Sequence, residues 1–129
     1  MTDLVSEFLQ HTANRNTLHF DEKYVKLVYK MILTCSNQFN VYDEFASLQG
    51  FIDIIIFKAP ASTACYEAII ELKYLKKSEA TEANIEKQLA EGVSQINYYM
   101  QDERLTNREN FKKFVIVFVG FEVARLVEL

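Results

Sequence analysis

The sequence predicts an α/β domain in which helices cover both faces of a mixed β-sheet. Two segments, 52–57 and 114–121, are almost entirely apolar, as expected of strands that are buried on both faces of a sheet. A long amphipathic segment, 82–101, lies between the third and fourth predicted strands. Because a strand, a crossover helix and a second strand in one sheet pair in parallel, the sheet is expected to combine parallel and antiparallel neighbours.

Apolar residues recur at helical spacing in two segments near the N-terminus. The first segment predicts a short helix over 3–12, which a polar connector follows. The second predicts an amphipathic helix over 20–35. We therefore expect residues 1–19 to form an N-terminal helix and connector, and residues 20–129 to form the main domain.

Three strands that are joined by turns should follow the second helix. Segments 39–45, 52–58 and 66–75 are rich in β-branched and aromatic residues, with partial alternation. The two connections between them hold Gly50 and the only proline, Pro60. The second of these strands is apolar on both faces, which indicates a central position in a sheet that is covered on both sides.

The C-terminal part predicts one helix and two further strands. Segment 82–101 has an apolar stripe at helical spacing, and Gly92 in its middle costs about 1 kcal/mol relative to alanine unless something packs closely there. A charged surface loop is expected over 102–110, followed by strands over 113–121 and 123–128.

Composition and charge exclude several classes of protein. The 129 residues hold 14 basic and 18 acidic side chains, so the domain as a whole is not a basic nucleic-acid-binding module. No signal peptide or bilayer-length apolar segment is present, which predicts a cytoplasmic protein without a membrane partner. Cys35 and Cys65 are too few for a disulfide framework and are expected to be buried, reduced thiols.

Polar side chains interrupt two neighbouring strands of the predicted sheet. Asp53 interrupts the second strand, and Glu71 and Lys73 interrupt the third. Alternation places Glu71 and Lys73 on one face of their strand, with Leu72 on the other. Because strands that are joined by a short connection are neighbours, Asp53 is expected to come close to Glu71.

Two carboxylates beside a lysine suggest a specific chemistry. Buried carboxylates are costly unless they are paired or bind a metal ion. Oxygen ligands suit Mg²⁺ or Mn²⁺, with coordination positions left for water and a phosphate. A lysine beside such an ion polarises an attacking water or stabilises developing negative charge. The pattern therefore favours metal-assisted hydrolysis of a phosphodiester.

These residues also carry a resemblance to a known family. The sequence GFID at 50–53, followed by ELK at 71–73, resembles the PD-(D/E)XK nuclease superfamily. More narrowly, the chain is similar to the nuclease-like domain that follows an AAA-ATPase-like domain in many bacterial proteins. The resemblance extends from about 22 to 120 and implies a restriction-endonuclease-like fold with an αβββαβ core. A chain of this kind is either the C-terminal domain of such a protein or a stand-alone variant.

The resemblance implies a role for each matching residue. Asp53 and Glu71 would bind Mg²⁺ or Mn²⁺, and the carbonyl group of Leu72 would be a third ligand. Glu22 matches an acid of the first helix that often completes the metal site. Lys73 would orient or activate the attacking water.

The resemblance extends to the long helix and to possible partners. Gln95 matches a Q-x-x-x-Y motif and would contact the nucleic-acid backbone or water near the site. Phe51 stands where this branch usually has an arginine, so the alternative to an active nuclease is an inactive interaction module. The expected partners are nucleic acid, above all DNA, an ATPase-like domain in cis, and a second copy of the chain.

The residues alone leave structural alternatives open. Asp53 could cap the turn at Gly50, and Glu71 with Lys73 could form the solvated face of an edge strand. Gln95 could be an ordinary exposed residue of its helix. Similarly, Glu22 could serve only the dipole of its helix, because acids in a first turn are favourable in any helix.

Overall fold

The structure is a computed structural model, which describes residues 3–4, 7 and 22–129. The strands are β1 (Phe39–Ser47), β2 (Gly50–Lys58), β3 (Glu67–Leu75), β4 (Phe111–Val119) and β5 (Glu122–Glu128). The helices are α2 (Glu22–Cys35), α3 (Glu82–Tyr99) and α4 (Glu103–Thr106), with a short 3-10 helix η1 (Lys77–Glu79). Of the helix expected over 3–12, Asp3, Leu4 and Glu7 are helical, and its other residues lie outside the described part.

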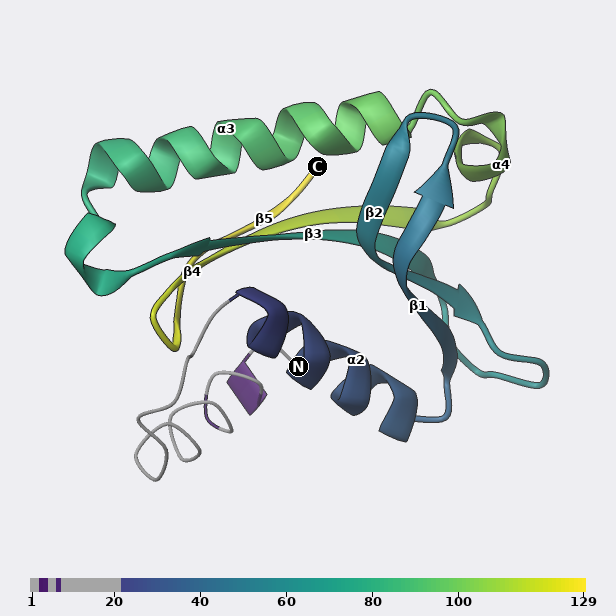
Figure 1. The fold of residues 1–129 in the computed structure, drawn as a ribbon. Coiled ribbons are helices and arrows are strands. Elements are labelled where there is room, and N and C mark those ends of the chain that lie inside the picture. The colour runs from purple at the N-terminus through teal and green to yellow at the C-terminus, as the bar shows by residue number, and fades with distance from the viewer. Residues whose placement is uncertain (1–2, 5–6, 8–21) are drawn as a thin grey trace.

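The five strands form one mixed sheet in the order β1-β2-β3-β4-β5. Neighbouring strands are antiparallel except β3 and β4, which are parallel and are joined by α3. Helix α3 lies across one face of the sheet, and α2 lies against the opposite face (Figure 1). The expected α/β class, the mixed sheet and the crossover helix are therefore confirmed.

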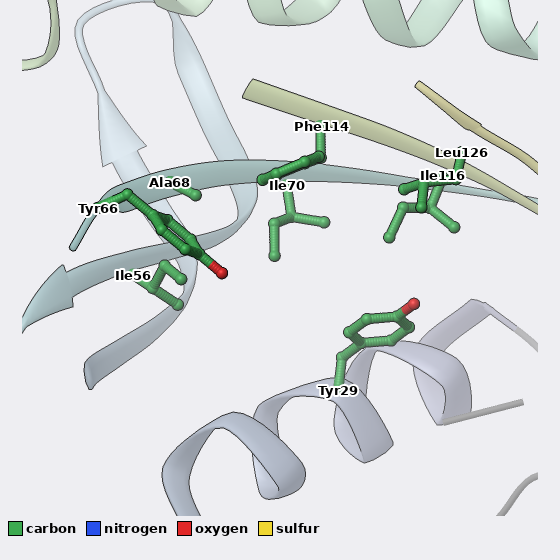
Figure 2. Close-up of a pocket in the computed structure, with 8 residues that line it drawn as sticks. All are labelled: Tyr29, Ile56, Tyr66, Ala68, Ile70, Phe114, Ile116 and Leu126. Atoms are coloured by element: carbon green, nitrogen blue, oxygen red, sulfur yellow. The ribbon is translucent and has the colours of Figure 1, made fainter. Parts of the chain in front are cut away.

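The core consists of two layers, one on each face of the sheet. Ile54 and Ile56 of β2 pack with α2, whereas Ile55 packs with α3, and all three are at most 1% exposed. On the α2 side, an apolar cavity of about 130 Å³ lies between Tyr29 and sheet side chains such as Ile116 (Figure 2). The cavity is lined by aliphatic and aromatic side chains, so we assign it to the packing of the core.

Gly92 is required by the close approach of α3 to the sheet. A Cβ atom at this position would lie 2.5 Å from Cγ1 of Val115 on β4. We expect Gly92→Ala to lower the free energy of unfolding by about 1–3 kcal/mol through overpacking, although alanine is the better helix former by about 1 kcal/mol. Urea unfolding measures the change, and Ala90→Gly on the exposed side of α3 calibrates helix propensity. A Gly92→Ala variant as stable as the wild type would show that α3 shifts without cost.

The segment after α3 differs from the expected surface loop. Asp102 is fully buried and caps α4, because its carboxylate accepts hydrogen bonds from the backbone N–H groups of Arg104 and Leu48. The Arg104 guanidinium, which pairs with Asp102 at 2.6 Å, holds the pKa of that carboxyl well below its usual range. Since Leu48 lies at the tip of the β1–β2 hairpin, Asp102 fixes this tip to the end of α3.

Cys35 and Cys65 are free thiols, but both are exposed, so the expectation that they are buried was wrong. Cys35 is in the last turn of α2, and Cys65 lies in the extended connection before β3, between the half-buried residues Ala64 and Tyr66. Among the described residues, we find no helix with the length and apolar character needed to cross a membrane.

Candidate active site

The site lies where β2 and β3 separate. The two strands pair with each other only at Ile54–Ile70, Ile55–Ile69 and Ile56–Ala68. Over most of their length, β2 pairs only with β1 and β3 pairs only with β4. Asp53 is the first β2 residue beyond this short ladder. Its Oδ2 accepts a hydrogen bond of 3.1 Å from the backbone N–H of Leu72 on β3. A side-chain carboxylate thus satisfies a buried backbone donor that the partner strand has left unpaired.

Glu71 and Lys73 project from the same face of β3, toward α3. Because β3 lies between β2 and β4, the alternative of a solvated edge strand is wrong. The Glu71 side chain is 4% exposed, and its Oε1 lies 3.4 Å from Nζ of Lys73. Its second oxygen, Oε2, is buried and has no hydrogen-bond partner within the described part of the chain.

The electrostatic state of Glu71 reflects this environment. Burial, together with the negative charge of Asp53, raises the pKa of the Glu71 carboxyl to about 7, while Lys73 acts in the opposite direction. A buried carboxylate oxygen without a donor, beside a second carboxylate, is an arrangement that a divalent cation would satisfy. The residues present therefore fit Mg²⁺ or Mn²⁺.

The protein supplies few side-chain ligands for such an ion. Among residues 3–4, 7 and 22–129, no group of three or more His, Cys, Asp or Glu side chains is arranged to hold a metal. Asp53 and Glu71 would therefore need help from a main-chain oxygen or water. The N–H and C=O groups of one strand residue point to the same side, so the carbonyl of Leu72 faces the same gap as its N–H.

Glu22 lies apart from this pair of carboxylates. It is an exposed residue in the first turn of α2, and it does not join Asp53 and Glu71 in a cluster of three acids. The negative charge of Glu22 helps to raise the pKa of Lys26, which lies one turn later on the helix.

Lys26 is a site residue that the sequence analysis missed. Its Nζ lies 2.6 Å from Oδ1 of Asp53, and the two side chains are only 16% and 14% exposed. Burial alone would lower the pKa of Lys26, but the hydrogen bond to Asp53 and nearby negative charges raise it overall. A signal was present, because Lys26 precedes the buried residues Tyr29 and Leu33 by three and seven positions on one helical stripe.

Gln95 joins the site from α3. Its Oε1 is buried without a hydrogen-bond partner among the described residues. Gln95 and Lys73 line the same open hollow of about 630 Å³, so the alternative of an ordinary exposed helix residue is not supported. The other lining residues are Lys87, Ala90, Glu91 and Ser94.

The start of β2 is fixed by the tyrosine of the Q-x-x-x-Y motif. The hydroxyl of Tyr99 donates a hydrogen bond of 2.9 Å to the carbonyl of Phe51. Gly50 has a φ of +131°, a backbone conformation that residues with a side chain rarely adopt. Its Cα hydrogen faces the Tyr99 ring. The Phe51 side chain is 69% exposed, so the ring that replaces the arginine of the branch does not enter the core.

Comparison with known proteins agrees with this architecture. A mixed sheet that separates at an Asp and a Glu-x-Lys, with helices on both faces, defines a restriction-endonuclease-like domain. The family model described as the PD-(D/E)XK nuclease superfamily matches residues 20–128, and the chain belongs to this superfamily. Comparison with curated proteins and with solved structures found no match. Nucleases of this superfamily generally use divalent metals and act on nucleic acid.

Proposed function

We propose that this domain is a metal-dependent nuclease that hydrolyses phosphodiester bonds, with DNA as the expected substrate. The observation that carries the proposal is the convergence of Asp53, Glu71 and Lys73 at the separation of β2 and β3. Three charged side chains at one point of an otherwise apolar sheet have a large desolvation cost, and a structural role alone does not account for it.

Each residue has a chemical role in this proposal. Asp53, Glu71 and the Leu72 carbonyl would hold Mg²⁺ or Mn²⁺, which when bound lowers the pKa of a coordinated water and neutralises phosphate charge. Lys73 would donate a hydrogen bond to the attacking water or to a phosphate oxygen. Gln95 would bind the nucleic-acid backbone or a water in the adjoining hollow. A direct ligand role for Glu22 has no support from its exposed position.

The surface charge indicates that the domain does not bind DNA tightly by itself. With a formal net charge of −4, few phosphates are neutralised, and affinity for nucleic acid depends on that number. The hollow beside Lys73 gives room for a nucleotide next to the scissile phosphate. We propose that a second copy of the chain, or an ATPase-like domain in cis, supplies the remaining contacts.

A second candidate function is an inactive interaction module that has kept the superfamily fold. Two observations favour it. Phe51 replaces the arginine usual in the branch, and Lys26 already neutralises Asp53. The two candidates differ in metal binding, because a silent module needs no affinity for Mn²⁺.

Cleavage of plasmid and of oligonucleotides tests the proposed function. The full chain should cut in Mg²⁺ or Mn²⁺ and stop in EDTA, and Asp53→Asn should lower the rate at least about a hundredfold. Asp43→Asn is the matched control, because Asp43 also pairs with a lysine of α2, at 2.7 Å, but lies outside the site. Equal cleavage by wild type and Asp53→Asn would assign the activity to another site or to a contaminant. Duplex DNA, single-stranded DNA and RNA then define the substrate.

A further inference from the structure

Both carboxylate oxygens of Asp53 are engaged within the protein. Oδ2 accepts the backbone N–H of Leu72, and Oδ1 lies 2.6 Å from the ammonium of Lys26. The Leu72 contact belongs to the backbone and is fixed by the sheet. The Lys26 contact comes from a flexible side chain on α2, so a ligand of Asp53 could displace it.

The charges of the site balance without any added ion. Asp53 and Glu71 carry two negative charges when ionised, and Lys26 and Lys73 carry two positive charges. A divalent cation that binds the two carboxylates therefore enters a cluster that is already neutral. Its repulsion from Lys26 is strong, because both cations would share one partly buried oxygen.

We infer that Lys26 occupies the metal-binding oxygen of Asp53 and has to withdraw from it when a divalent cation binds. The inference rests on the proposed function, since it takes Asp53 as a metal ligand. It assigns Lys26 as a positioning residue that sets metal affinity and that does not act on the substrate.

The surroundings of Lys26 offer the ammonium an alternative position. Glu22 lies one helical turn earlier on α2. Glu44 lies on β1 between Asp43 and Phe45, which pair with Ile54 and Ile52 on either side of Asp53. Both glutamates are exposed, and the negative charge of each contributes to the raised pKa of Lys26. The lysine can thus leave Asp53 and remain paired at the surface. This exchange gives Glu22 a role next to the metal site without making it a ligand.

Titration calorimetry with Mn²⁺ at fixed pH tests the inference on the full chain. Lys26→Met removes the competing cation, and we expect it to bind Mn²⁺ about tenfold more tightly than the wild type. Lys26→Gln should do the same, whereas Lys26→Arg keeps the charge and should bind no more tightly than the wild type. Lys30→Met is the matched control, because Lys30 pairs with Asp43 one turn later on α2. Its Mn²⁺ affinity should be unchanged.

The outcomes separate this inference from the proposed function. If the wild type binds Mn²⁺ and cuts DNA, but Lys26→Met and Lys26→Gln bind no more tightly, the inference is wrong and the function stands. If only the Lys26 variants bind Mn²⁺, and Asp53→Asn in the same background abolishes binding, the inference is right and the wild-type domain is silent. If folded wild type and both variants all fail to bind, both proposals are wrong. Circular dichroism establishes folding, and Lys26→Gln replaces Lys26→Met if the latter does not fold.

Discussion

Lys73→Met should reduce metal-dependent phosphodiester cleavage by about 10²–10³-fold without weakening Mn²⁺ binding. The ammonium of Lys73 lies 3.4 Å from Oε1 of Glu71, which is longer than a strong charge-assisted hydrogen bond. In the free protein the ammonium is therefore held only weakly by Glu71, and it is available to a water or phosphate in the hollow that Lys73 lines. Its removal also takes a positive charge away from the metal site, so metal affinity should stay the same or rise.

Single-turnover cleavage and Mn²⁺ calorimetry together distinguish this role from a structural one. A lysine that only neutralised Glu71 would leave cleavage nearly unchanged in the Lys73→Met variant, and that result would contradict the prediction. Lys112→Met is a suitable control, because Lys112 pairs with Glu128 at 3.0 Å on the far side of β4. It should cleave at the wild-type rate.

The sequence was sufficient to predict the fold because its patterns are local. Four isoleucines in β2 and the apolar run of β4 indicate strands that are covered on both faces, and 3.6-residue periodicity marks α2 and α3. The apolar pattern also identified Asp53, Glu71 and Lys73, since each is a charged residue at a position where a buried strand should be apolar. Their chemical roles stay predictions until they are tested.

The residues that were missed depend on contacts between distant parts of the chain. Asp102 is buried because the tip of the β1–β2 hairpin, at Leu48, donates to it across 54 residues of sequence. Lys26 reaches Asp53 only because α2 lies against the sheet at the point where β2 leaves β3. Neither the angle of a helix on a sheet nor the end of a strand ladder is encoded in periodicity. The helical stripe therefore places Lys26 on the buried side of α2 but does not indicate which residue it contacts.

The stability of the metal-free protein should fall as pH rises from about 4.5 to 7, because of Glu71. Its pKa is about 7 in the folded state and 4.5 in the reference state, so the folded protein binds the proton more tightly. Below pH 4.5 the carboxyl is neutral in both states and no cost arises. Above pH 7 it is ionised in both, and the folded state bears the full cost of about 3 kcal/mol.

Glu71→Gln isolates this effect, because glutamine is neutral at every pH. Urea unfolding between pH 5 and 8, with EDTA present, measures the free energy of unfolding at each pH. In the variant this free energy should no longer fall with pH because of Glu71, and at pH 8 the variant should be more stable than the wild type. Glu67→Gln, four residues earlier on β3, should instead be less stable than the wild type at every pH of this range and should keep the wild-type slope. The hydrogen bond from Arg108 lowers the pKa of Glu67, so its carboxylate is ionised throughout the range and stabilises the fold. Mn²⁺ at pH 8 should then stabilise the wild type but not Glu71→Gln, because ligand binding to the folded state alone raises its stability. Parallel pH profiles of Glu71→Gln and wild type would show that Glu71 stays ionised at no cost, and they would remove the reason to expect a cation beside it.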